Sequence, residues 1–307
     1  MKIVFMGTPE FAVPCLEMLL NEHFEIIGVF TQPDKLSNRG YKINYSPVKK
    51  IALENNLLLF QYHKLKNIEI KLKKLKPDLI VVVAFRILSS EILNLPLLGC
   101  INVHASLLPK YRGSAPINWA IINGEKETGV STIFLKNEID AGDIILQEKI
   151  FIEENETAED IYDKLKKMAS MILLKTIKKI ESGKVERIIQ KPVESFYASK
   201  LKRENGLIDW NKDVVSIYNL IRGLFPWPGT YTFLNGKRLK ILKAEIYNKE
   251  IFLGKIGEII KIEKKGIVVN TLNGLILLKE VQMENAKKML AYDFAQGVHL
   301  KAGNLLA

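Results

Sequence analysis

Cysteine is nearly absent from the sequence, and so are the ligand patterns of metal sites. Cys15 and Cys100 are the only two cysteines, with no CxxC pair and no cluster of cysteine with histidine. Two isolated cysteines exclude a disulfide framework, and without ligand spacing no zinc site is predicted. We expect both thiols to be buried small apolar groups and no metal to take part in the chemistry.

Long apolar runs are absent as well. The longest buried-looking run, residues 79–85, has the length of a strand and falls far short of the roughly 18 residues of a membrane helix. Lys2 precedes a short Ile-Val-Phe run that Gly7 interrupts, which is not the pattern of a signal peptide. We therefore expect a cytoplasmic protein that does not bind a membrane, and a monomer.

The glycine-rich motifs that hold phosphates are missing too. The sequence contains neither GxGxxG nor GxxxxGK[ST], so neither a dinucleotide fingerprint nor a P-loop is supported. Gly7-Thr8-Pro9 does follow the first expected strand and open a helix, where backbone N–H groups can hold an anion. For this segment, a tight turn at the edge of a cleft and a substrate contact both remain open.

Acidic residues are scarce in the last two-fifths of the chain. Residues 1–183 carry 24 Lys and Arg against 22 Asp and Glu, residues 184–205 carry 6 against 3, and residues 206–307 carry 15 against 9. Most of the net charge of +11 therefore lies after residue 183. A polyanionic partner such as a nucleic acid and a solvated basic face are both compatible with this asymmetry.

What the sequence does contain is an alternation of strands and helices in its first half. A chain of 307 residues, 48% apolar and 26% charged, is long enough for two globular domains. Strands are expected at residues 3–6, 25–30, 78–85 and 99–104, helices at 11–21, 47–55, 64–76 and 157–182, and an antiparallel pair at 128–135 and 143–151. Runs apolar on both faces predict buried parallel strands. We expect a Rossmann-like α/β domain with a mainly parallel sheet over residues 1–183.

The pattern of apolar and polar residues changes after Gly183. Residues 184–205 are polar and weakly periodic, which is typical of a linker. From there, short strands alternate with tight turns, and Asn-Gly pairs at 235–236 and 273–274 are strong hairpin signals. Residues 214–224 form the one clear helix. Residues 206–307 therefore predict a small C-terminal β-barrel of the oligonucleotide-binding type.

Two polar residues interrupt an expected buried strand. Asn102 and His104 are two positions apart, so both project to one face of the strand. They lie near its C-terminal end, where open α/β sheets bind their ligands. Burying two polar side chains costs stability unless both are used, which favours a functional over a structural role.

The segment that follows carries a family resemblance. Asn102-Val103-His104, then Ser-Leu-Leu-Pro-Lys-Tyr-Arg-Gly, and later Ile-Asp-Ala-Gly-Asp around Asp140 together resemble the signature of the 10-formyltetrahydrofolate-dependent formyltransferases. The resemblance implies a formyltransferase domain in which Asn102, His104 and Asp140 are catalytic. It implies that 10-formyltetrahydrofolate, the formyl donor, contacts Ser106, Leu107, Leu108 and Pro109.

A second segment, after the central strand, resembles a folate-binding stretch with departures. Many tRNA-acting members have glycine and proline where this chain has Arg86 and Ser89. The version found here is similar to the folate-pocket segment of the ribonucleotide-acting member. The resemblance implies that Arg86, Ile87 and Leu88 contact the pterin, with a core loop as the alternative reading.

The chemistry of formyl transfer accounts for these residue types. An amine nitrogen attacks the formyl carbon and gives a tetrahedral intermediate with a developing oxyanion. Asn102 and a protonated His104 can each donate a hydrogen bond to that oxygen, a contribution typically of ~10²–10³ in rate. Asp140 can stabilise the charged imidazole and take the proton of the amine. Neither a metal nor a covalent nucleophile is required.

The acceptor of the formyl group is not fixed by this trio. Over its full length the chain resembles the family branch that formylates methionine on initiator tRNA, but a UDP-amino-sugar branch has a nearly identical signature, and a catalytically silent RNA-binding module is a third possibility. The ribonucleotide-acting branch lacks a C-terminal domain and is excluded by length. Residues 31–42 resemble an insertion found in the tRNA-acting branch, with a solvated loop as the alternative. The expected tRNA contacts are basic: Lys35, Arg39, Lys42, Lys49, Lys200, Lys202 and Arg203.

Overall fold

The chain forms two compact units. The computed structural model describes residues 1–36, 43–191, 196–250 and 254–307, so the expected contacts Arg39 and Lys42 lie outside the described residues. The first unit comprises Met1–Gly113, Glu127–Ile150 and Tyr162–Ala198, and the second comprises Ser114–Lys126, Phe151–Ile161 and Ser199–Ala307. The chain thus passes from one unit to the other several times along its length.

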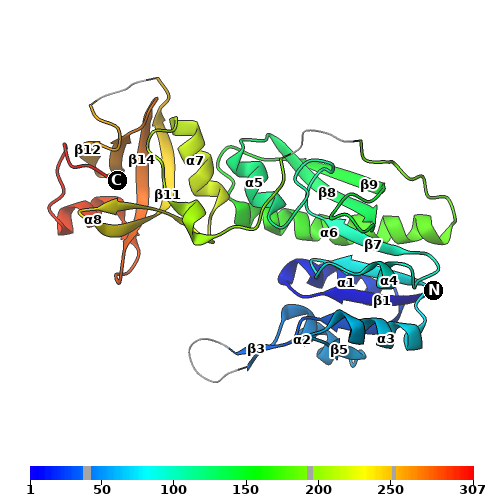
Figure 1. Ribbon diagram of the computed structural model, residues 1–307. Coiled ribbons are helices and arrows are strands. Elements are labelled where there is room, and N and C mark those ends of the chain that lie inside the picture. Colours follow the sequence, from blue (N-terminus) through cyan, green and yellow to red (C-terminus); the bar gives the residue numbers. More distant parts are fainter. Residues whose placement is uncertain (37–42, 192–195, 251–253) are drawn as a thin grey trace. The chain divides into compact units, whose positions relative to one another are not determined.

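A seven-stranded sheet forms the centre of the first unit, in the order β5-β2-β1-β6-β7-β8-β9 (Figure 1). The strands are β1 (Lys2–Gly7), β2 (Glu25–Thr31), β5 (Leu59–Gln61), β6 (Leu79–Val83), β7 (Cys100–His104), β8 (Glu127–Phe134) and β9 (Ile144–Phe151). Strands β5, β2, β1, β6 and β7 run parallel, and β8 runs antiparallel to β7. The predicted mainly parallel α/β sheet is confirmed.

Burial on both faces explains the apolar strands. Every residue of β6 and β7 is buried, and in β1 only Lys2 is exposed. The helices of this unit are α1 (Val13–Asn21), α2 (Pro47–Glu54), α3 (Leu65–Leu75), α4 (Ser90–Leu93) and most of α6 (Ala158–Glu181). Ile68 and Leu72 on α3 pack in one cluster with Val4, Ile80 and other sheet residues. Among the described residues, no helix is both long and apolar enough to cross a bilayer.

Helix ends follow the capping signals of the sequence. The hydroxyl of Ser46 accepts the N–H of Lys49 at the start of α2. At the start of α6, Thr157 and Asp160 bond reciprocally, each side chain to the backbone N–H of the other. Gly183, with φ +67°, follows the end of that helix.

The second unit is built on an antiparallel sheet, in the order β10-β11-β14-β13-β12 with β15 beside β14 (Figure 1). Its strands are β10 (Thr230–Leu234), β11 (Lys237–Asn248), β12 (Ile259–Glu263), β13 (Gly266–Asn270), β14 (Leu275–Met283) and β15 (Met289–Leu290). Asn235 and Gly236 both have positive φ, as the predicted hairpin turn requires. The final residues join the two edge strands: Ala307 bonds to Phe233 in both directions, and Asn304 accepts the N–H of Ile259.

Helix α7 (Val214–Gly223) ties two earlier segments to this sheet unit. Asn118 on α5 (Pro116–Ile122) donates to the Gly223 carbonyl at 2.8 Å. Arg222 donates to the Glu156 carbonyl at 3.0 Å. Residues 114–126 and 151–161, which precede the expected linker in sequence, therefore fold as part of the second unit. A further helix, α8 (Ala291–Gly297), packs on β13 and β14.

Candidate active site

Strand β7 presents two polar side chains at the carboxyl edge of the first unit's sheet. Asn102 is 9% exposed and His104 is 6% exposed, so both lie in the interior. They project to the same side because they are two residues apart on one strand. Their neighbours on β7, Ile101 and Val103, are apolar and buried, which fixes the strand against its neighbours β6 and β8.

The ring of His104 is held by acceptors at both nitrogens. Nε2 lies 2.9 Å from the backbone carbonyl of Tyr111, and Nδ1 lies 3.6 Å from Oδ2 of Asp140. A carbonyl oxygen only accepts, so Nε2 carries a proton and donates it to Tyr111. Nδ1 faces the carboxylate beyond hydrogen-bond length, so it is the ring nitrogen that remains available for proton exchange with a third group.

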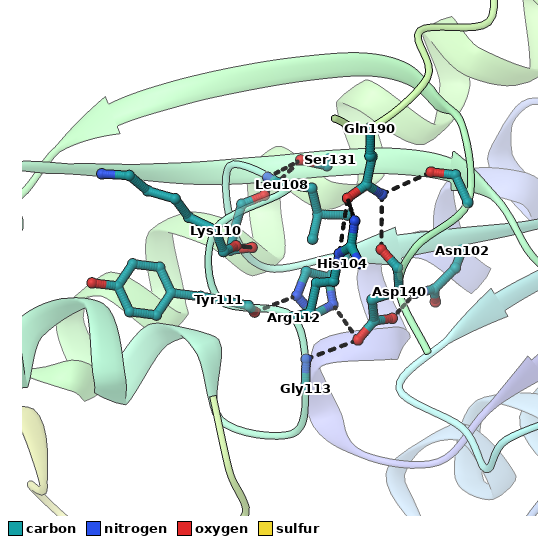
Figure 2. Close-up of polar contacts among 12 residues, drawn as sticks. Asn102, His104, Leu108, Lys110, Tyr111, Arg112, Gly113, Ser131, Asp140 and Gln190 are labelled. Atoms are coloured by element: carbon teal, nitrogen blue, oxygen red, sulfur yellow. Dashed lines mark hydrogen bonds and ion pairs between the residues drawn. The ribbon is translucent and has the colours of Figure 1, made fainter. Parts of the chain in front are cut away.

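Asp140 joins the trio from the loop between β8 and β9. Its Oδ2 accepts the backbone N–H of Gly113 at 3.0 Å, and its Oδ1 faces Nδ2 of Asn102 at 3.4 Å. Asp140 has φ +51°, a left-handed conformation that costs a non-glycine residue about 1–2 kcal/mol. The structure thus brings Asn102, His104 and Asp140 into mutual contact, although they are separated by up to 38 positions in sequence (Figure 2).

The loop after β7 is fixed by its own hydrogen bonds. Ser106 donates its hydroxyl proton to the Lys110 carbonyl at 2.7 Å. The N–H of Leu108 donates to Ser131 at 3.1 Å, and Gln147 donates to the Leu108 carbonyl at 2.9 Å. Ser106 and Leu108 are therefore buried supports, and the Leu108–Pro109 peptide is cis. Of the four expected folate contacts, only Leu107 and Pro109 keep partly exposed side chains.

The conformation of the segment after β6 is not predicted by the sequence, and in the structure Arg86 holds it in place. Arg86 donates to the Tyr62 carbonyl at 2.8 Å and to the His63 carbonyl at 2.9 Å. Its guanidinium thereby ties this loop to the end of β5. Leu88 is buried and Ile87 is 64% exposed, so Ile87 is the member of the expected pterin segment that offers accessible apolar surface.

The expected tRNA contacts occupy different settings. Lys35 lies on the short strand β3 (Lys35–Leu36), which pairs with β4 (Ile43–Asn44). Lys200, Lys202 and Arg203 are exposed in the second unit. The sequence predicts that all of these side chains bind phosphates. In the structure, some of them are exposed, whereas Lys49 already binds neighbouring side chains of the chain.

Lys49 is bound to its own chain. Its Nζ contacts Asp34 Oδ2 at 2.5 Å and Gln61 Oε1 at 3.0 Å, and it lies 3.9 Å from the centre of the Tyr45 ring. The hydrogen bond from Lys49 lowers the pKa of Asp34 below its usual value, which keeps the pair ionised. Lys49 therefore fastens the base of the loop that contains Lys35.

Two further polar residues at this site, Arg112 and Gln190, have no role assigned from the sequence. They contact each other, and Gln190 also contacts the loop of Asp140. Arg112 belongs to the Ser-Leu-Leu-Pro-Lys-Tyr-Arg-Gly segment of the family signature, whereas Gln190 is marked only as a glutamine after Ile188 and Ile189 in a segment that otherwise looks like a linker. Such a signal is too weak to identify a site residue without the fold.

The two cysteine thiols are buried and have raised pKa values, so neither is a reactive thiolate. Cys15 is fully buried and Cys100 is 3% exposed. Burial raises the pKa of the Cys100 thiol to about 12 and also raises the pKa of Cys15. The prediction that both are buried apolar groups is confirmed.

Known proteins resemble both parts of the chain. A formyl transferase family model matches residues 1–177, and a formyl transferase C-terminal domain model matches residues 200–299. The methionyl-tRNA formyltransferase of Alkaliphilus oremlandii is 48% identical over 310 residues, covering 100% of this chain and 99% of that protein. That of Clostridioides difficile is 46% identical over 309 residues, covering 100% of both.

A solved structure shares the fold along most of the chain. WlaRD, a sugar 3N-formyl transferase crystallised in the presence of dTDP and 5-N-formyl-THF, matches with a TM-score of 0.70 at 25% identity. The match covers 94% of this chain and 99% of that one. With full-length relatives near half identity and both domain models matched, the chain belongs to the methionyl-tRNA formyltransferase family.

Proposed function

We propose that this methionyl-tRNA formyltransferase moves the formyl group of 10-formyltetrahydrofolate to the amino group of methionine on initiator tRNA, at the site of Asn102, His104 and Asp140. The observation that carries the proposal is the contact of Asp140 with both polar side chains of β7. An amide donor, an imidazole and a carboxylate within reach of one another suit an acyl transfer without a covalent intermediate on the enzyme.

The reaction requires one bond to form and one to break. The amino nitrogen of methionine attacks the formyl carbon, a new C–N bond forms, and the carbonyl oxygen becomes an oxyanion. The amine nitrogen loses a proton, the bond to N10 of the folate breaks, and N10 takes up a proton as tetrahydrofolate leaves. The oxyanion and the two proton transfers are where enzyme side chains can help.

His104 and Asn102 are the proposed donors to the oxyanion. The bond to Tyr111 fixes the ring of His104 by Nε2, which leaves Nδ1, on the side of Asp140, as the nitrogen that can donate to the oxyanion. The 3.4 Å contact between Asn102 and Asp140 is long for a hydrogen bond, so the Asn102 amide can exchange it for the developing negative charge. Donors already fixed in place need little rearrangement in the transition state.

Asp140 is the proposed acceptor of the amine proton. The Gly113 N–H occupies Oδ2, and Oδ1 has only the long contact with Asn102. A carboxylate has about four lone-pair positions, so acceptor capacity remains on Oδ1. The side chain of Asp140 is 13% exposed, which gives an amine or a water access to it.

The folate donor would lie against two loops that leave the same edge of the sheet. Ile87 follows β6, and Leu107 and Pro109 follow β7, the next parallel strand. All three keep accessible apolar surface, which fits a flat heterocycle such as the pterin. Ser106, Leu108 and Arg86 would hold these loops in shape through the bonds already described.

The acceptor surface, defined here as Lys200, Lys202 and Arg203, is proposed to bind the tRNA backbone. All three side chains are exposed, and the region from 206 onward adds 15 basic against 9 acidic residues. On β11, Arg238 and Lys240 are exposed while Leu239 and Ile241 are buried, so this strand also directs cations outward. Phosphate contacts of this kind supply affinity that salt weakens.

A direct choice of acceptor tests the proposed function. The protein is incubated with 10-formyltetrahydrofolate and either initiator tRNA charged with methionine or a UDP-linked 4-amino-sugar. We expect formylation of the methionine amino group and none of the sugar. Formylation of the sugar with none on the charged tRNA would contradict the proposal and favour the amino-sugar branch.

A further inference from the structure

A short segment of the first unit lies beside the loop of Asp140. Residues 187–190 follow the stretch matched by the first family model and precede the second. Ile188 bonds to Ile144 of β9 in both directions, at 2.8 and 2.9 Å. Ile188 and Ile189 are 56% and 75% exposed, whereas the polar Gln190 is 9% exposed. Burying the polar Gln190 while Ile188 and Ile189 stay exposed costs free energy unless the amide is hydrogen-bonded, which directs attention to its partners.

The amide of Gln190 is fully used. Its Nε2 donates to the Asp140 carbonyl at 2.8 Å and to the Gly142 carbonyl at 2.7 Å. Its Oε1 accepts from Nε and Nη2 of Arg112, at 3.0 and 2.8 Å (Figure 2). Two donors and two acceptor positions are all that a primary amide has, so its orientation is fixed.

The turn that Gln190 contacts has an uncommon backbone conformation and lies close against β8. Asp140 is in a left-handed conformation, and such residues persist only where their surroundings hold them. A side chain at Gly142 would place a Cβ 1.5 Å from the Phe134 carbonyl, so the loop passes directly against β8 here. The two bonds from Gln190 fall on the carbonyls of residues 140 and 142, at this close approach.

Arg112 connects Gln190 to the loop after β7. It precedes Gly113, whose N–H holds Oδ2 of Asp140, and follows Tyr111, whose carbonyl holds His104. Its Nη1 also contacts Glu138 at 3.2 Å, in the same loop as Asp140. The Gln190–Arg112 pair therefore links the segment that carries Asp140 with the segment that orients His104.

We propose that Gln190 and Arg112 are positioning residues that set the Asp140 carboxylate against His104, so that the segment between the two family regions is part of the reaction centre. The inference rests on the catalytic role proposed for Asp140. Gln190 touches no reacting atom, and it acts through the backbone of the Asp140 loop. A shift of about 1 Å in a catalytic group can cost ~10²-fold in rate.

Two substitutions of Gln190 distinguish its bonds to the Asp140 loop from its bonds to Arg112. Gln190→Ala removes all four bonds, and we expect kcat to fall by about 10- to 100-fold while the KM for the folate donor changes less than about twofold. Gln190→Glu can still pair with Arg112 but cannot donate to the two carbonyls, so we expect a similar loss of kcat. Wild-type kcat in Gln190→Glu would overturn the proposal, because anchoring Arg112 would then suffice.

The matched control is Gln296→Ala, an exposed glutamine on α8 in the second unit. We expect its kcat to equal that of the wild type. Thermal unfolding of each variant shows that the assay temperature lies in its folded range. A Gln190→Ala enzyme that keeps full kcat would overturn the proposal.

A double-mutant cycle tests whether Gln190 acts through Asp140. If it does, Gln190→Ala should lower single-turnover rates by less than about twofold in an Asp140→Asn background. An equal fold loss in both backgrounds would show a merely structural role. The Asp140→Asn single variant tests the proposed function by itself, since its full activity would remove the catalytic role of Asp140 whatever Gln190 does.

Discussion

The proposed reaction centre and the proposed acceptor surface of this protein differ in whether their side chains already have partners within the chain. At the reaction centre, His104 is 6% exposed and both its ring nitrogens face acceptors within the protein. On the acceptor surface, Lys200, Lys202 and Arg203 are exposed. The first arrangement is already fixed within the protein, whereas the second would gain its partners from the substrate. Damage to the first should therefore appear in kcat, and damage to the second in KM and in salt dependence.

A large effect on kcat is expected from His104→Ala. Loss of a fixed donor to an oxyanion typically lowers rate by ~10²–10³-fold, and we expect a fall of that size in kcat. The affinity for the folate donor, measured by equilibrium titration, should stay the same, because the apolar loops remain. A variant that loses folate affinity in step with kcat would show that His104 binds the donor instead.

A smaller effect, of a different kind, is expected on the acceptor surface. The triple substitution of Lys200, Lys202 and Arg203 by Ala should raise the KM for charged tRNA and leave kcat nearly unchanged. The slope of log affinity against log salt should fall by roughly 1 for each phosphate that the variant no longer neutralises. A matched triple substitution of exposed Lys167, Lys178 and Lys179 on α6 serves as control, and equal effects of the two sets would contradict the assignment.

The expected tRNA-binding residue Arg39 offers a single-site version of the same test. Arg39→Ala should weaken the use of charged tRNA and leave folate affinity intact, since Arg39 is predicted to contact phosphates of the tRNA and not the folate. Steady-state kinetics with each substrate varied in turn measures both. Equal loss of both would mean that the loop is structural.

A still smaller effect is expected at the ion pair between Lys49 and Asp34, which lies within the protein. Asp34→Asn breaks the pair with Lys49 and should lower Tm by about 1–4 °C at pH 7. The pKa of Asp34 is lowered in the folded protein, so the pair stabilises fully above the ordinary Asp pKa and loses this effect as pH falls through the lowered value. The Tm difference between the two proteins should therefore vanish in strong acid. A difference that persists there would exclude the ion pair as its cause.

The smallest effect is expected from thiol reagents. Cys15 and Cys100 are buried and their pKa values are raised, so iodoacetamide at neutral pH should leave both unmodified and kcat unchanged. Mass spectrometry of the intact native protein measures the modification. Rapid alkylation of Cys100, which lies on β7 with Asn102 and His104, would show that this strand opens in solution.

The long periodic elements of the fold can be predicted from the sequence. The strands around residues 3–6 and 99–104, the helix from 158 to 181 and the hairpin at 235–236 all form as expected, because their signals are local. Short elements such as β5, α4 and β15 are not predicted, since two to four residues show no period. Likewise, only tertiary contacts such as that between Asn118 and Gly223 place residues 114–126 in the second unit.

The candidate site divides in the same way. Asn102 and His104 stand out because polar residues on a buried strand are locally anomalous. The roles proposed for Gln190 and Arg112 cannot be predicted from the sequence, because they depend on tertiary contacts: Gln190 donates to the Asp140 carbonyl, and Arg112 donates to Gln190. Lys49 has the sequence character of a phosphate-binding residue, and only the fold shows that Asp34 and Gln61 already occupy it.

The trio of Asn102, His104 and Asp140 is proposed to be preformed for transfer of a formyl group to the methionine amine. The most direct test of this proposal is the single-turnover formation of N-formylmethionyl-tRNA from 10-formyltetrahydrofolate, by wild type and by Asp140→Asn, across a range of salt. General base catalysis contributes typically 10²–10⁴-fold, so we expect the variant to be slower by a factor of that order at every salt concentration. Equal rates for the two proteins, or a difference that disappears at one end of the salt range, would contradict the claim.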